Sequence, residues 1–267
     1  MRTKYDVNQS FMLLFFMVIG FVMFLFLLFP IVNVILITST SSLVSAIFDP
    51  QVQFSIFLSF YTAGIATLIA FLLGTPLAYV LARRNFPFKE TIDSLIDIPI
   101  LIPHTVAGIA LLTLFGEAGI LGQMFNSMNI RFIDTIFGII IAQLFVSSPF
   151  YIKTVRESFE KIDPRYHNVA RTLGATPSKA FIKVEFPLAA HSMVSGAILC
   201  WARAISEFGA VIILAYYPPI ASILIYQRFV SYGLSSALPV TTLLIFVTVI
   251  IFVIIRLVQT KFQEEYK

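Results

Sequence analysis

Residues 163–177 read DPRYHNVARTLGATP and lie within the most basic part of the chain. Seven of the 18 Lys and Arg residues fall between Lys153 and Lys183, and long apolar runs lie on both sides of this segment. Asp163 followed by Pro164 is typical of a helix N-cap with proline at the first helical position. Gly174 is typical of the residue that follows a helix C-cap. The stretch therefore predicts a short helix from Pro164 to about Leu173.

This predicted helix is amphipathic. Four apolar side chains recur on one face at i, i+3, i+4 and i+7, namely Tyr166, Val169, Ala170 and Leu173. Three polar residues lie beside this stripe, namely Arg165, Asn168 and Arg171. A helix of about ten residues is marginal alone in water, so it needs a surface to pack against. Lipid headgroups and a groove in a soluble partner both fit this pattern.

The composition is that of a membrane protein. Hydrophobic residues make up 58% of the 267 positions and charged residues 12%, and the mean hydropathy is +0.92. Soluble domains are about half apolar and about a quarter charged. The basic residues do not form a separate soluble patch, so we expect no nucleic-acid partner. The single cysteine, Cys200, lies in an apolar run and is expected to be a buried, inert thiol.

Six stretches are long and apolar enough to cross about 30 Å of hydrocarbon. They are residues 11–37, 54–81, 94–115, 135–151, 192–215 and 239–257. Continuous apolar runs predict helices rather than the alternating strands of a barrel. The sequence therefore predicts an all-α integral membrane protein with one transmembrane domain over residues 1–267. Residues 152–191 are expected to form a loop that carries the short helix.

The distribution of Lys and Arg predicts the orientation. If both termini are cytoplasmic, 15 of the 18 basic residues lie on the inner side. Only Arg131 and Arg228 then lie outside, and Arg203 lies within a span. Positive charge favours the cytoplasmic side, so we expect a multi-pass plasma-membrane protein with a cytoplasmic basic loop.

Arg203 and Glu207 are ionisable residues within the fifth expected span. Their i, i+4 spacing on a helix lets them neutralise each other. Such residues are costly in lipid and usually face protein or water. A purely structural ion pair and a role in lining or gating an anion pathway are both open. Neutral donors for such a pathway are Thr105, Ser147, Ser148 and Gln143, although bonding to the helix backbone also explains them.

Sites for metals and nucleotides are not predicted. His104, His167 and His191 are isolated in sequence, and none has a second ligand at metal-binding spacing. No phosphate-binding loop with its lysine is present. We therefore expect no cofactor in this chain, no catalytic residue, and an energy source on another subunit.

The segment that starts at Asn168 and runs through Gly174 to Pro187 resembles the EAA loop of ABC importer permeases. In that family the loop supplies the coupling helix that inserts into a cleft of the ATPase subunit. The resemblance implies a type I importer-like fold and assigns eight residues to ATPase coupling: Arg165, Tyr166, Asn168, Val169, Ala170, Arg171, Leu173 and Gly174. One position departs from the pattern, since Asn168 replaces the leading Glu and offers only neutral hydrogen bonds.

Three further segments resemble the molybdate, tungstate and sulfate permeases. They are residues 73–87, residues 98–116 and residues 203–210. The resemblance favours a molybdate/tungstate permease, with sulfate as the alternative oxyanion. It implies a prokaryotic system with a second copy of the chain, two ATPase subunits that hold ATP and Mg, an external oxyanion-binding protein, and membrane lipid around the spans.

Two other classes of protein are less compatible with the residues. An ion-coupled secondary carrier typically has inverted repeats and several intramembrane carboxylates, whereas only Glu207 is convincing here. An intramembrane enzyme needs a nucleophile, a metal cluster or a paired acid and base, and the sequence shows none of these.

Overall fold

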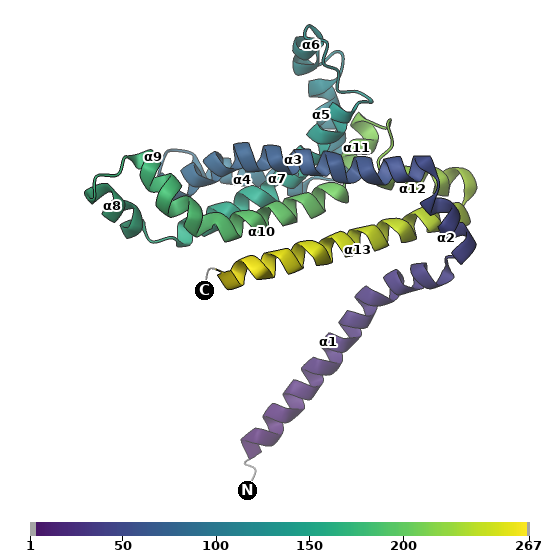
Figure 1. Ribbon diagram of the computed structural model, residues 1–267, viewed down its shortest axis with the longest axis horizontal. Helices are drawn as coiled ribbons and strands as arrows, with labels where there is room; N and C mark the ends of the chain where they lie inside the picture. The colour runs from purple at the N-terminus through teal and green to yellow at the C-terminus, as the bar shows by residue number, and fades with distance from the viewer. Residues whose placement is uncertain (1–3, 266–267) are drawn as a thin grey trace. The chain divides into compact units, whose positions relative to one another are not determined.

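The computed structural model describes residues 4–265, with side chains described for residues 12–255 and for residue 257. The described chain is helical and contains no strand (Figure 1). This confirms the prediction of an all-α protein. The basic residues near both ends that enter the orientation argument, among them Arg2 and Lys267, lie outside the described side chains.

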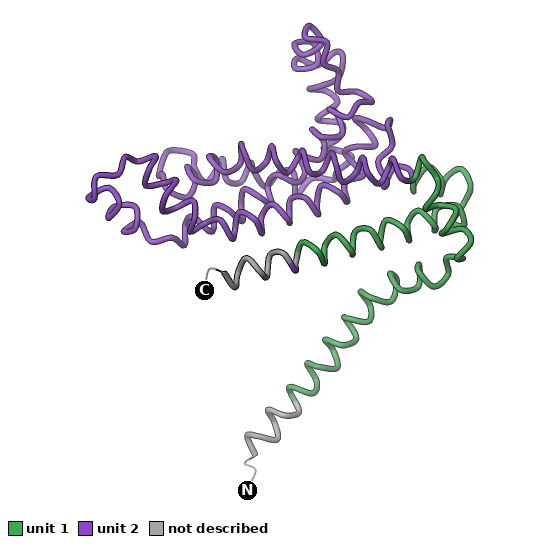
Figure 2. Tube along the Cα trace, viewed as in Figure 1, with its two compact units in different colours: residues 1–52, 225–255 green, residues 53–224, 256–267 purple. Residues whose placement is uncertain are grey.

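Two compact units divide the chain (Figure 2). Unit 1 contains residues 1–52 and 225–255, and unit 2 contains residues 53–224 and 256–267. The long helices of unit 1 are α1 (Lys4–Ile37) and most of α13 (Leu234–Glu265), and a shorter helix, α2 (Thr40–Ile47), follows α1. Within unit 1, Arg228 and Asp49 form an ion pair of 2.5 Å, and the hydroxyls of Thr38 and Thr242 lie 2.7 Å apart.

Unit 2 is built on three long helices that run side by side (Figure 1). These are α3 (Pro50–Arg83), α7 (Ile136–Lys161) and α10 (Phe186–Ile205), of which α3 begins in unit 1. Leu81, Tyr151, Val155, Phe159 and Met193 fill a buried apolar cluster between these three helices. Apolar burial of this kind fixes the relative positions of the helices.

Short helices complete the described chain. They are α4 (Lys89–Leu101), α5 (His104–Phe115), α6 (Ile120–Asn126), α8 (Pro164–Thr172), α9 (Pro177–Ala180), the π-helix η1 (Phe181–Glu185), α11 (Gly209–Leu214) and α12 (Ala221–Tyr232). A second apolar cluster joins α5, α7 and α11 through Leu111, Ile139 and Leu214.

The third expected span, residues 94–115, is divided in the structure. It consists of α4 and α5, which meet at an angle of 111°. The break falls at Ile102 and Pro103, where Ile102 has the extended ψ of 148°. Proline disfavours helical backbone in the residue before it, which explains why the chain turns here. Pro99 lies inside α4 and does not end it.

Two further boundaries differ from the expected ones. The fifth stretch, residues 192–215, is interrupted after Ile205, and α11 begins at Gly209. Residues 152–191 are not one loop, because α7 continues to Lys161 and α10 begins at Phe186. Apolar periodicity alone could not locate these ends, since both helices extend beyond their most hydrophobic parts. Five described helices are long and apolar enough to cross a membrane, or six spans if the bent pair α4–α5 counts as one.

Candidate coupling and pathway sites

The N-terminus of α8 is capped as the sequence predicts. The Asp163 carboxylate accepts a hydrogen bond of 2.8 Å from the backbone N–H of Arg165, and Pro164 occupies the first turn. The Arg165 guanidinium forms an ion pair with the same carboxylate. The hydrogen bond from the Arg165 side chain, together with that from its backbone, holds the pKa of Asp163 below its usual value. A negative cap also complements the positive end of the helix dipole.

The C-terminus of α8 is closed by Gly174, which has a φ of 87°. The N–H of Gly174 donates to the carbonyl of Arg171 and the N–H of Ala175 donates to the carbonyl of Ala170, both at 3.0 Å. This pair of bonds is the Schellman motif, which needs a residue with left-handed backbone. Thr176 then caps α9 by accepting from the N–H of Lys179. Both predicted caps of α8 are confirmed.

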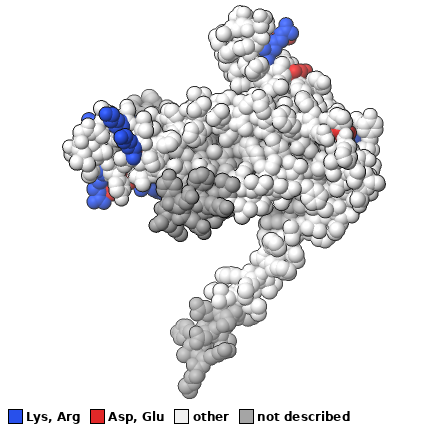
Figure 3. All heavy atoms as spheres, in the orientation of Figure 1, with Lys and Arg blue, Asp and Glu red and all other residues white. Residues whose placement is uncertain are grey.

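The apolar stripe of α8 faces away from the rest of unit 2. Tyr166 is 58% exposed, Val169 56% and Leu173 83%. Ala170 is half-buried, whereas Arg165, Asn168 and Arg171 are exposed. Lys and Arg side chains gather at the end of the bundle that carries α8 and α9 (Figure 3). The chain thus presents a short, capped helix with three large apolar side chains that nothing in the described residues covers.

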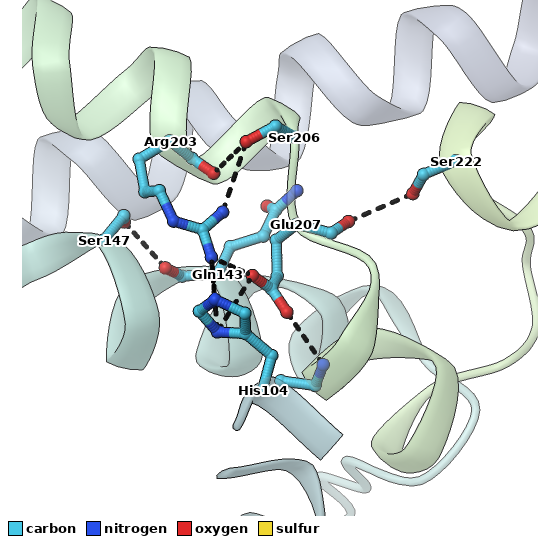
Figure 4. A network of polar contacts seen from close by, with 8 residues as sticks. His104, Gln143, Ser147, Arg203, Ser206, Glu207 and Ser222 are labelled. Atoms are coloured by element: carbon cyan, nitrogen blue, oxygen red, sulfur yellow. Dashed lines mark hydrogen bonds and ion pairs between the residues drawn. The ribbon is translucent and has the colours of Figure 1, made fainter. Parts of the chain in front are cut away.

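Arg203 and Glu207 form the centre of a second site, at the break between α10 and α11 (Figure 4). The Arg203 Nη2 lies 2.7 Å from the Glu207 Oε2. The Glu207 side chain is 1% exposed, whereas that of Arg203 is 20% exposed. The expected ion pair is therefore present, and its cation is the more accessible partner.

His104, the first residue of α5, joins this pair. Its Nε2 lies 2.7 Å from the Arg203 Nη2, and its Nδ1 lies 3.6 Å from the Glu207 Oε2. With a neutral ring, the imidazole can accept from the guanidinium. His104, which is isolated in sequence, thus contacts both members of the expected ion pair in the fold. The contact joins residues 99 positions apart, and the sequence contains no local pattern that would reveal it.

Glu207 also fixes the start of α11. Its Oε1 accepts a hydrogen bond of 2.7 Å from the N–H of Ala210, so the carboxylate satisfies one of the free donors at this helix end. Its own carbonyl accepts from the Ser222 hydroxyl at 3.0 Å. The close approach of α5 and α11 depends on Gly209, where an added Cβ would lie 2.7 Å from the Cβ of His104.

Gln143 lies on α7 beside this group and is fully buried (Figure 4). Neither atom of its side-chain amide has a hydrogen-bond partner among the described residues. A buried amide without partners is costly, so this position is an exception to the usual pairing of buried polar groups.

The remaining expected pathway residues are not joined to the Arg203 cluster by a hydrogen bond in the described structure. The Ser147 hydroxyl donates to the backbone carbonyl of Gln143 on the same helix at 2.6 Å. It also accepts from the Cys200 thiol on α10, so both of these partners are buried groups between α7 and α10. Ser148 is half-buried, and Thr105 is exposed next to His104. Cys200 is a buried free thiol.

A second group of polar contacts, not predicted from the sequence, lies at the end of the bundle near α8. His167 contacts the buried carboxylate of Glu185 at 2.9 Å. Arg83, from the end of α3, contacts the same carboxylate. These residues are 18 or more positions apart, and they belong to three different helices.

The chain belongs to the family of inner-membrane components of binding-protein-dependent transport systems, which matches residues 74–264. The chain is therefore a membrane-spanning subunit of a transport system.

Particular relatives narrow this class. The molybdate/tungstate transport system permease protein WtpB of Thermococcus kodakarensis is 45% identical over 80% of this chain and 81% of the relative. The WtpB protein of Pyrococcus furiosus is 44% identical over 78% of both chains. A probable sulfate transport system permease protein, cysT of Chlorokybus atmophyticus, is 36% identical over 74% of this chain and 71% of the relative.

A solved structure supports the fold. The crystal structure of a bacterial ABC transporter that imports the acidic polysaccharide alginate contains a chain that aligns with a TM-score of 0.76. The alignment covers 98% of both chains at 16% sequence identity. At this identity the likeness concerns the fold alone, and it confirms the importer-permease architecture expected from the resemblance.

Proposed function

We propose that this chain is the permease subunit of an ATP-driven importer that carries molybdate or tungstate across a prokaryotic plasma membrane. The observation that carries the proposal is the 45% identity to a molybdate/tungstate permease over four-fifths of the chain. The lower identity to a sulfate permease makes sulfate the second candidate. Molybdate, tungstate and sulfate are all tetrahedral dianions, so the same pathway chemistry serves each of them.

The proposal includes partners that supply energy and substrate. Two copies of the chain form the pathway, two ATPase subunits hold ATP and Mg on the inner side, and an external binding protein delivers the oxyanion. A two-fold dimer gives each ATPase subunit one equivalent docking surface. The charge distribution supports cytoplasmic termini and a cytoplasmic α8, since the basic residues concentrate around that helix.

The exposed stripe of α8 is the proposed contact with the ATPase subunit. Tyr166, Val169 and Leu173 would fill an apolar groove, in the manner of an amphipathic helix bound in a groove. Arg165, Asn168 and Arg171 would contribute at its rim, where a neutral Asn168 offers weaker contacts than a carboxylate. Closing of the ATPase dimer would move α8 and so alternate the access of the pathway.

The proposed pathway passes the cluster of Arg203, Glu207 and His104. The guanidinium is the one partly exposed group of the ion pair, so it can offset the charge of a dianion while Glu207 holds it in place. Because Glu207 cancels much of this charge, the site would bind an anion weakly and release it readily. Selectivity would then depend mainly on the external binding protein.

Uptake of labelled substrate tests the proposal directly. The chain would be reconstituted in proteoliposomes with its ATPase subunit and binding protein, and ATP-dependent uptake of labelled molybdate, tungstate and sulfate would be measured in competition. We expect molybdate and tungstate to compete with each other and to exclude sulfate. Preferential uptake of sulfate would assign the alternative substrate, and uptake driven by an ion gradient without ATP would contradict the importer assignment.

A further inference from the structure

Glu185 is a buried carboxylate at the end of the bundle near α8. Its side chain is 1% exposed. The Tyr79 hydroxyl donates to Oε2 at 2.9 Å, and the His167 Nδ1 lies 2.9 Å from the same oxygen. The Arg83 Nη2 lies 2.8 Å from Oε1, although this pair lacks hydrogen-bond alignment and is an ion pair only. A buried carboxylate is costly without such partners, so these contacts hold one another in place.

Arg83 extends the group to a fourth helix, α7. Its Nη1 donates a hydrogen bond of 2.9 Å to the carbonyl of Ile162, which is the C-cap of α7. Together these groups join the end of α3, the end of α7, the middle of α8 and the last residue of η1. We call this set the Glu185 junction; it consists of Tyr79, Arg83, Ile162, His167 and Glu185.

Aromatic packing around Tyr79 stiffens the Glu185 junction. The ring of Tyr79 lies edge-on to Phe159 with centroids 5.2 Å apart and edge-on to Phe181 at 4.7 Å. Such ring pairs have a preferred geometry and resist sliding. Phe181 opens the π-helix η1, which ends at Glu185 and leads directly into α10. Single π-turns are frequent at functional positions of helices.

The attachment of α8 to the bundle is otherwise sparse. Its three large apolar side chains point outward, and the polar contacts of Arg165 and Thr172 stay within the helix and its cap. His167 on α8 makes a polar side-chain contact with another helix, η1. A displacement of α8 therefore reaches α3 and α10 through the chain ends and through the contact of His167 with Glu185.

We propose that Glu185 is the positioning residue that transmits movement of α8 to α3 and α10. The inference rests on the proposed docking of α8 on the ATPase subunit and identifies the path by which that docking acts on the spans. Tyr79 and Arg83 connect Glu185 to α3, and the chain itself connects Glu185, through the end of η1, to α10. Without the His167–Glu185 contact, α8 can move with the ATPase subunit without moving α3 and α10.

The test compares ATP hydrolysis with substrate uptake in the complete complex. The permease, its ATPase subunit and the binding protein would be reconstituted in proteoliposomes, and molybdate taken up per ATP hydrolysed would be measured. For E185Q we expect basal ATP hydrolysis to persist while uptake per ATP falls by about tenfold, a size typical of coupling between two sites. Glu157→Gln is the matched control, because Glu157 is exposed and pairs only loosely with Lys161, at 4.0 Å.

Two substitutions of His167 distinguish a loss of movement transmitted from α8 from a loss of folding. Asn places an amide donor close to the position of the imidazole Nδ1, whereas Leu fills a similar volume and offers no donor. We expect H167N to retain uptake per ATP and H167L to lose it by about tenfold, with equal assembly of the complex. If E185Q does not assemble, this pair decides the question by itself.

Three results would overturn the inference. They are unchanged uptake per ATP in E185Q, equal uptake per ATP in H167N and H167L, and loss of ATPase binding in H167L. Failure of the proposed function would look different from failure of this inference. In that case the unmodified complex itself would take up no oxyanion with ATP, or would not bind an ATPase subunit.

Discussion

The Arg203 Nη2 and the Glu207 Oε2 lie 2.7 Å apart where α10 ends and before α11 begins. The pair is asymmetric in its surroundings, because the carboxylate is buried and the guanidinium is partly accessible. Removing the cation therefore leaves a buried charge, whereas removing the anion frees a cation that can reach solvent.

Replacement of Arg203 by Leu should destabilise the chain by about 3–5 kcal/mol, because Glu207 is left as an uncompensated buried charge. The double replacement of Arg203 and Glu207 by Leu and Gln should recover part of this loss. Thermal unfolding in detergent measures the stability, and uptake in proteoliposomes measures transport. We expect both variants to transport poorly, since neither retains the cation. Full transport by R203L would contradict the pathway role of this residue, and an unchanged unfolding temperature would contradict the stabilising role of its ion pair.

Gly174→Val should uncouple ATP hydrolysis from uptake. A side chain is strained at the φ of 87°, by roughly 1–2 kcal/mol, and the Schellman bonds that close α8 would weaken. No neighbouring atom lies within 4 Å of an added Cβ, so the effect is one of backbone conformation and not of crowding. Gly20→Val is a suitable control, since it also has open space around the added Cβ and no positive φ. Equal uptake in both variants would show that the end of α8 is not needed for coupling.

Leu173→Asp should abolish binding of the ATPase subunit without destabilising the isolated permease. Leu173 is 83% exposed, so in the free chain a carboxylate there remains hydrated. In an apolar groove the same charge would be desolvated at a cost of several kcal/mol. Copurification of the ATPase subunit from mild detergent measures the effect. Ser178→Asp, at an exposed position of α9, controls for the added charge, and it should leave binding unchanged.

Asp49 should make the stability of unit 1 depend on acid pH. Burial, the largest single influence, would raise its pKa, but the hydrogen bonds from Arg228 and from the backbone of Gln51 outweigh it, so the pKa is lowered. A carboxyl whose folded pKa is depressed contributes stability above its unfolded pKa, about 4, and that contribution is lost as the pH falls through the lower folded value.

Asp49→Asn removes this titration. The temperature of unfolding should fall at neutral pH and change less than that of the unmodified chain between about pH 4 and pH 2. Glu117→Gln, at an exposed position, serves as the control for loss of one carboxylate. An acid profile that is the same in D49N and the unmodified chain would contradict the assigned role of the Arg228 pair.

Local patterns account for what the sequence predicts well. Long apolar runs predict helices because lipid leaves backbone groups no other partner, and the caps of α8 depend on Asp163, Pro164 and Gly174 within a few residues of the helix. The break at Pro103 was only partly foreseeable, since Pro99 is tolerated inside α4. The break after Ile205 has no proline and becomes intelligible only once the Glu207 carboxylate is seen to bond the N–H of Ala210.

Contacts between distant segments were beyond local reasoning. His104 reaches Arg203 across 99 positions, and Glu185 reaches Tyr79 across 106. Nothing near Glu185 in the sequence distinguishes it from a solvated acidic residue beside Lys183. Its burial follows from the way that α3, α7 and η1 meet, which is a property of the tertiary packing.

The narrow contact between α5 and α11 restricts how the protein can change shape. A methyl group on Gly108 would lie 2.8 Å from the Cβ of Ile213, and one on Gly209 would lie 2.7 Å from that of His104. Surfaces this close cannot slide past each other, so we expect α5 and α11 to move together as one rigid body. Flexing must then occur at the non-helical connections of this pair, among them residues 102–103 and residues 206–208, the second of which contains Glu207.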